Sequence, residues 1–126
     1  MAIKQKPSAR EKKRYVGFEI ISKSRIPSLS KVQKQIVLSM IQYKGELGAS
    51  QAGAIVVPER WDQDHQQGIL RVNRKRVNDA IAALTLTRRI DGGEVVIRTT
   101  GTSGMIAKAQ NKRGRALLVG GISNGG

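Results

Sequence analysis

The sequence predicts an α+β domain whose elements follow the order β-α-β-β-α-β. Three observations predict it: four short runs rich in β-branched residues, two longer stretches with apolar residues at helical spacing, and Gly, Pro or Asn at the boundaries. The chain has 126 residues, of which 39% are hydrophobic, enough for one domain with a buried core.

The first predicted strand runs from Tyr15 to Ser22. Its alternate residues share one apolar face, namely Val16, Phe18 and Ile20. A break follows at Pro27, after which either Ser28 or Ser30 is placed to cap a helix. Apolar residues then recur at spacings of three and four, namely Leu29, Val32, Ile36, Met40 and Tyr43. Gly45 is a natural stop for this helix.

The middle of the chain predicts a connection and two strands with a long loop between them. Residues 45–53 are glycine-rich and predict the connection. Ala54–Val57 predicts a short strand, which Pro58 ends or places at a sheet edge. Residues 59–67 are polar and fit a hairpin loop before the next strand, Gly68–Val72.

The last third predicts a second helix and a final strand. Asn73 is placed to cap the helix, whose inner stripe is Val77, Ala80, Ile81 and Leu84. A turn at residues 91–93 leads into the strand Glu94–Thr99, in which alternate residues share a face. The basic segment from Met105 to Lys112 predicts a short helix.

This order is that of a ferredoxin-like split βαβ fold, an antiparallel sheet with both helices on one face. We expect a flexible basic N-terminal arm over residues 1–13, a single ferredoxin-like domain over 14–113 and a disordered Gly-rich tail over 114–126. The sheet face without helices is the face that meets RNA in many such domains, although the fold alone does not establish a function.

The composition excludes several classes of site. The chain has no cysteine, which excludes disulfides, thiolate metal sites and a cysteine nucleophile. Its single histidine, His65, excludes a site built on two histidines. No apolar run approaches the ~18 residues that span a bilayer, and residues 1–13 lack the apolar run of a signal peptide. We therefore expect a soluble, cytoplasmic protein.

The charge is strongly positive and unevenly distributed. The formal net charge is +14, from 23 Lys and Arg against 9 Asp and Glu. Three short blocks hold 14 of these bases: six in residues 1–14, four in 71–76 and four in 107–115. Solvated surfaces usually mix their signs, so the blocks indicate a footprint for a polyanion such as nucleic acid.

Base stacking is not the predicted mode of RNA recognition. Domains of this topology stack bases on aromatic residues of the third strand, whereas Gly68–Val72 has none. The whole chain has one Trp, two Tyr and one Phe. Recognition of the RNA backbone and shape by Lys and Arg is the remaining mode.

One acidic loop resembles an active site. Glu59, Asp62 and Asp64 lie beside His65, and carboxylates at such spacing are able to hold magnesium in a nuclease. The loop has no apolar neighbours to fix that geometry, so a solvated loop without a metal is the preferred interpretation. Trp61 is interpreted as a packing or partner-interface residue. No phosphate-binding or nucleophile-elbow motif is present, and we predict no active site in the chain.

Three motifs resemble the archaeal ribonuclease P protein component 2 family. Residues 10–16, REKKRYV, with Phe18 following, are similar to that family's opening. Gly68–Arg71, GILR, and the later AAL of residues 82–84 resemble its G-I-L-R strand and its second helix. Residues 101–106, GTSGMI, are similar to its G-V-S-G-T-I, with Thr for Val and Met for Thr. The resemblance spans about residues 8–113.

The resemblance implies a subunit of the ribonucleoprotein that removes 5′ leaders from precursor tRNA. The RNA subunit would cleave with magnesium, and the protein would hold neither a cofactor nor a catalytic residue. Its partners would be ribonuclease P RNA, protein component 3 and other subunits, with two copies of each protein able to form a heterotetramer. A general basic ribonucleoprotein component and a magnesium nuclease are the alternatives.

Ten basic residues are predicted to contact RNA. The resemblance carries this role onto Lys12, Lys13, Arg14 and Arg71. Charge alone adds Arg74, Lys75, Arg76, Lys108, Lys112 and Arg113. Arg74, Lys75 and Arg76 are expected to open the second helix, where backbone N–H groups also favour anions. For Arg71 the alternative is an ion pair with Asp or Glu inside the fold.

Overall fold

The computed structural model describes residues 12–105, which form a five-stranded antiparallel sheet and two α-helices. The strand order is β2-β3-β1-β5-β4. The predicted basic arm before residue 12, the basic helix beyond Met105 and the tail lie outside the described residues.

The four predicted strands are all present in the sheet. β1 (Lys13–Ser22) lies at the centre, between β3 (Gln67–Asn73) and β5 (Gly93–Ser103). β2 (Ile55–Val56) pairs with β3 at one edge, beside the proline expected to end it or to mark an edge. The other edge is β4 (Arg89–Ile90), a two-residue strand that the sequence pattern did not predict.

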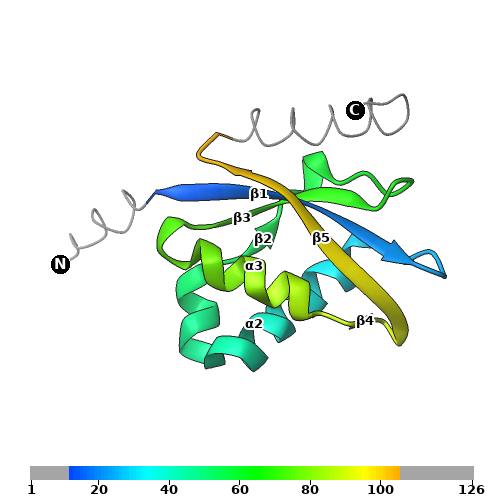
Figure 1. Ribbon diagram of the computed structural model, residues 1–126, viewed down its shortest axis with the longest axis horizontal. Helices are drawn as coiled ribbons and strands as arrows, with labels where there is room; N and C mark the ends of the chain where they lie inside the picture. Colours follow the sequence, from blue (N-terminus) through cyan, green and yellow to red (C-terminus); the bar gives the residue numbers. More distant parts are fainter. Residues whose placement is uncertain (1–11, 106–126) are drawn as a thin grey trace.

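The two helices lie side by side on one face of the sheet, as Figure 1 shows. They are α2 (Leu29–Ala52) and α3 (Val77–Leu86). Between helices and sheet lies one apolar core, whose largest members include Val16, Phe18, Val32, Ile36, Met40, Leu70 and Leu84. The predicted ferredoxin-like arrangement is confirmed.

The prediction of an irregular connection after Gly45 is wrong. Gly45 does break the first helix, because its φ of 77° and ψ of 174° are non-helical. Helical structure then resumes and continues to Ala52, where Gly53 ends it in the left-handed conformation with its N–H donating to the Ala49 carbonyl. Burial of Gly48 and Ala52 stabilises this second segment, and burial is not apparent from glycine content.

β5 is longer than its predicted extent, Glu94–Thr99. It continues to Ser103 because Gly101 and Thr102 pair with Gly17 and Val16 of β1, after a register shift between Gly17 and Phe18. The GTS of the third motif is therefore part of strand β5, paired with β1.

The second motif strand is fixed by close packing around Gly68. Phe18 and Trp61 are stacked, with ring centroids 6.2 Å apart and planes at 30°. Gly68 lies beside both rings: a Cβ built on it would be 2.8 Å from Trp61 Cε3 and 3.2 Å from Phe18 Cζ. Trp61 packs against the core, which confirms its interpretation as a packing residue.

Candidate nucleic-acid interface

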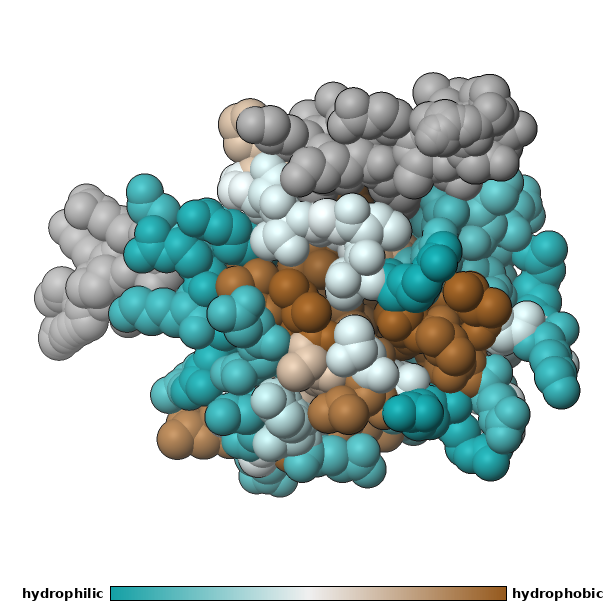
Figure 2. All heavy atoms as spheres, viewed as in Figure 1, coloured by the Kyte–Doolittle hydropathy of each residue, from teal (hydrophilic) through white to brown (hydrophobic). Residues whose placement is uncertain are grey.

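The described end of the first basic block, from Lys12 onward, meets the second block at one end of the sheet. β1 and β3 are antiparallel, so the start of one lies beside the end of the other, and Lys13 is paired with Asn73. The Arg74 N–H donates to the Lys12 carbonyl at 2.9 Å. Four exposed side chains therefore share this end, and we name them the basic cluster: Lys12, Lys13, Arg74 and Lys75. Figure 2 shows hydrophilic side chains gathered where β1 begins.

A cavity of about 520 Å³ opens within this cluster. Its lining brings Lys13 and Lys75 together with polar groups from the end of α2, namely Ser50, Gln51 and Gly53, and with Asn73 and Arg76. Two ammonium groups beside hydroxyl and amide donors suit a phosphate oxygen. The cavity therefore brings uncharged polar residues to the cluster, which the distribution of charge along the sequence could not predict.

Arg76 is engaged inside the fold. Its guanidinium donates to Asp79 Oδ2 at 3.0 Å and also to Gln51 Oε1, and its side chain is 29% exposed. These contacts tie the end of α2 to the start of α3. Of the three bases in block 74–76, Arg74 and Lys75 are the ones whose exposed side chains face solvent.

The start of the second helix offers fewer N–H donors than the sequence suggested. Asn73 was predicted to cap the second helix, but its Oδ1, which accepts the Lys75 N–H at 2.8 Å, caps the short turn before it, and the N-cap position of α3 itself is Arg76. The Asn73 cap opens this 3₁₀ turn, η3 (Arg74–Arg76), that precedes α3. The Arg74 N–H donates to Lys12 and the Val77 N–H to the Arg74 carbonyl. These three donors, on Arg74, Lys75 and Val77, are already bonded and are therefore not available to a phosphate.

Arg71 and Arg14 lie on β3 and β1 next to the cluster. Arg71 is exposed between buried Leu70 and Val72, and within residues 12–105 it forms no ion pair with a carboxylate. Arg14 is half-buried beside Gly104 of the third motif, where a Cβ would be 3.1 Å from its Nη1. Their contact with RNA stays a prediction, and Lys108, Lys112 and Arg113 lie outside the described residues.

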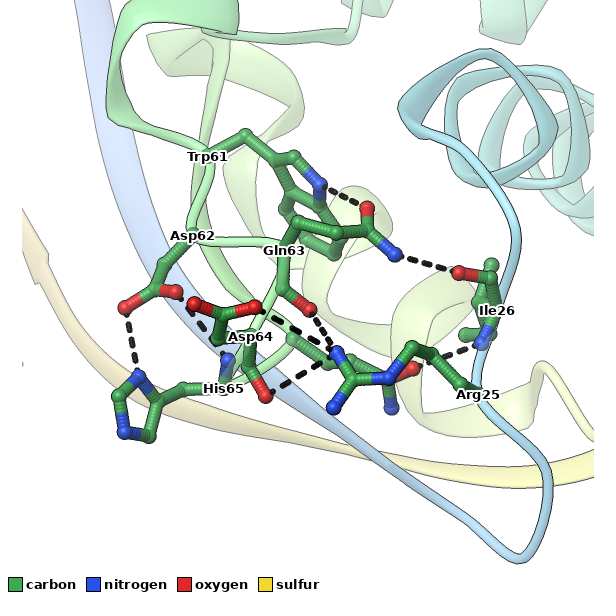
Figure 3. Close-up of polar contacts among 8 residues, drawn as sticks. Arg25, Ile26, Trp61, Asp62, Gln63, Asp64 and His65 are labelled. Carbon is green, nitrogen blue, oxygen red and sulfur yellow. Dashed lines mark hydrogen bonds and ion pairs between the residues drawn. The ribbon is translucent and has the colours of Figure 1, made fainter.

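The acidic loop is organised by hydrogen bonds among its own residues and with the segment before α2 (Figure 3). Asp62 accepts from the His65 backbone N–H at 3.1 Å, and its other oxygen lies 2.8 Å from His65 Nδ1. Arg25 donates to the Gln63 carbonyl at 3.0 Å, and its guanidinium is 3.8 Å from Asp64. The side chain of Gln63 bridges Trp61 Nε1 and the Ile26 carbonyl.

The loop carboxylates do not converge on one point. Burial raises the pKa of Asp62, but hydrogen bonds and charge from His65 outweigh that effect, so its pKa lies below the ordinary value. Asp62 is thus ionised and used to close the turn. Within the described residues, no three His, Asp or Glu side chains are grouped so that they could hold a metal ion.

Comparison with known proteins identifies the family. The model of the Rpp14/Pop5 family matches residues 14–113. The chain is 33% identical over 106 residues to ribonuclease P protein component 2 of Pyrococcus furiosus, covering 84% of this chain and 86% of that protein. It is 36% identical over 106 residues to the same component of Thermococcus gammatolerans, with the same coverage. The chain belongs to the Rpp14/Pop5 family.

A solved structure shares the fold of this Rpp14/Pop5 family member. A chain in the cryo-EM structure of yeast ribonuclease MRP superposes with a TM-score of 0.60 at 9% identity, covering 85% of this chain and 89% of that one. The resemblance to the archaeal component 2 proteins, read from three motifs, is confirmed by the family match. Residues 12–105 contain no helix that is both long and apolar enough to cross a membrane.

Three further basic residues, which lie outside the three charge blocks, are at the other end of the sheet. Lys23 follows β1, and Arg88 and Arg89 precede or begin the short strand β4. The net charge of their segments does not reveal them, because acidic residues elsewhere in residues 15–70 and 77–106 balance the positive charge. Only the sheet topology brings them together beside the end of β1.

Proposed function

We propose that this Rpp14/Pop5 family member is a protein subunit of a ribonuclease P ribonucleoprotein, in which it binds the RNA subunit and supports 5′-leader removal from precursor tRNA. The observation that carries the proposal is the basic cluster, in which strand pairing joins two charge blocks from distant parts of the sequence around a polar cavity. Relatives over most of the chain are named ribonuclease P protein component 2.

In this proposal the protein positions RNA and the RNA performs the chemistry. Lys12, Lys13, Arg74 and Lys75 neutralise phosphates, with Arg71 and Arg14 extending the contact along the sheet. Magnesium belongs to the RNA subunit, and the chain itself contributes no catalytic group. Protein component 3 and a second copy of the chain are the protein partners that the family resemblance implies.

The test is reconstitution. Precursor tRNA is incubated with magnesium and the RNA subunit, with and without this chain and the other protein subunits. The proposal expects faster 5′-leader removal when the chain is present and no cleavage by the chain alone. Cleavage by the protein without RNA would favour the nuclease alternative. In a pull-down with the chain, recovery of ribosomal RNA in place of ribonuclease P RNA would favour a general ribonucleoprotein component.

RNA affinity is expected to fall steeply with salt. Neutralising ~6 phosphates predicts a slope of about −4 to −5 for the logarithm of the association constant against that of the salt concentration, because each neutralised phosphate adds ~0.7–0.9 through counterion release. Filter binding or fluorescence anisotropy from low to physiological salt measures this slope. A slope near zero would contradict a phosphate-based interface.

The acidic loop is expected to be dispensable for processing. It joins β1 near Ile20, through the Ile20 N–H to Gln66 carbonyl bond, at the end of the sheet far from the basic cluster. Replacing Asp62, Asp64 and His65 together by Ala removes the local turn bonds but no phosphate-binding cation. Precursor-tRNA cleavage by the reconstituted particle should stay within about twofold of wild type, as for other surface changes away from a site. A large loss would revive the metal-site interpretation.

A further inference from the structure

A second groove, of about 480 Å³, lies at the end of β1 opposite to the basic cluster. Ile21 and Val96 are direct cross-strand neighbours on β1 and β5 and line this groove. The two residues are 50% and 56% exposed, so together they leave aliphatic surface open to solvent. Figure 2 shows brown side chains bordered by teal ones where these strands run toward β4.

The rim of this Ile21–Val96 groove is positively charged. Lys23 and Arg88 line it, both are exposed, and neither forms an ion pair within residues 12–105. Arg89 lies opposite Glu94 in the β4–β5 pairing, with charged atoms 3.8 Å apart, so these two largely balance. Two cations beside an aliphatic floor therefore define the recognition chemistry.

We propose that the Ile21–Val96 groove docks a segment of a protein partner whose apolar side chains are flanked by Asp or Glu. The apolar side chains cover Ile21 and Val96, which removes aliphatic surface from water, and the acidic ones meet Lys23 and Arg88. The inference rests on the proposed function, since it assigns the partner to the same ribonucleoprotein.

Two observations favour protein over RNA as the occupant. The floor of the groove is the exposed aliphatic pair Ile21 and Val96, which apolar side chains of a protein cover and a phosphate backbone does not. The basic cluster is separated from the groove by about eight residues of β1, or about 26 Å at the rise of a strand. RNA at one end of β1 leaves the other end available to a protein.

Photo-crosslinking in the reconstituted particle tests the docking. p-Benzoylphenylalanine replaces Val96 in one sample and, as a matched control, the exposed Thr85 of α3 in another. From position 96 we expect an adduct that survives ribonuclease, is degraded by protease, and maps to a partner segment with Asp or Glu beside aliphatic residues. Arg88→Glu should reduce its yield about tenfold, whereas Lys34→Glu on α2, the same change in net charge, should leave it unchanged.

The contrary outcomes are equally specific. An adduct to labelled RNA, a yield at position 96 no higher than at position 85, or a yield insensitive to Arg88→Glu would overturn the docking proposal. Precursor-tRNA cleavage is measured in the same samples. An active particle without the protein adduct contradicts only the docking, whereas a wild-type chain that neither binds nor supports the RNA subunit contradicts the proposed function and the docking with it.

Discussion

Reversing the charges of Lys13, Arg74 and Lys75 together is expected to weaken binding to ribonuclease P RNA by about 100-fold or more. All three are exposed at the end of the sheet where β1 and β3 meet, and two of them line the same cavity. A hydrogen-bonded cation at a phosphate is worth on the order of 1 kcal/mol, so removing three amounts to about two orders of magnitude before the new repulsions are added. The salt slope should become shallower by about 0.7–0.9 for each phosphate that the variant no longer neutralises.

A matched variant separates this interface from the overall charge of the protein. Lys34→Glu, on α2, reverses an exposed lysine that forms no ion pair within residues 12–105. It is compared with Lys75→Glu alone, which changes the net charge equally. We expect the Lys34→Glu variant to bind RNA within a few-fold of wild type. Equal losses in both variants, with circular dichroism confirming that both fold, would mean that no particular end of the sheet is used.

Arg76 is left out of the charge reversal because of its partners in the fold. A glutamate there would lie beside Asp79 and lose the bond to Gln51, which joins α2 to α3. Such a variant would lose stability and RNA affinity together, and the two effects could not be told apart.

Gly68→Ala is expected to destabilise the fold by about 1–3 kcal/mol, because an added methyl group overpacks this site. The new carbon would be 2.8 Å from Trp61 Cε3 and 3.2 Å from Phe18 Cζ, and these rings are stacked on each other against the core. Gly68→Val should cost more. Thermal unfolding measures the effect, and about 1 kcal/mol corresponds to roughly 4–8 °C in a domain of this size.

Two further variants establish that the cause is packing. At Gly93 the nearest atom to an added Cβ is the Ile90 carbonyl oxygen at 3.7 Å, an ordinary van der Waals distance, so Gly93→Ala should change the melting temperature far less. Combining Gly68→Ala with Trp61→Leu should cost less than the sum of the two single changes, because the smaller side chain makes room. Additive effects would show that the ring is not what excludes a side chain at position 68.

Gly68 also shows how far a motif could be interpreted from the sequence. The GILR segment was recognisable as a strand from its apolar residues, and its resemblance to a family was visible in the letters. The reason for its glycine was not visible, because the rings that exclude a side chain come from residues 18 and 61, on other elements. Motif recognition identified the family; the tertiary packing explains the residue.

The strands and helices with strong apolar periodicity were determined by the sequence itself. Val16, Phe18 and Ile20 alternate, and Val32, Ile36 and Met40 repeat at helical spacing, because burial on one face imposes a local period. The helical segment after Gly45 and the strand β4 escaped prediction, since a few residues without a clear period acquire their structure only from what they pack or pair against.

The candidate interface likewise depends partly on composition and partly on the tertiary structure. Composition alone determined that the chain is strongly basic and lacks cysteine and paired histidines. The tertiary structure decided that Lys13 lies beside Lys75, that Arg76 is held by Asp79 and Gln51, and that Ile21 and Val96 form an exposed aliphatic pair. Strand pairing places residues of distant segments a few ångströms apart, and no pattern within either segment records its partner.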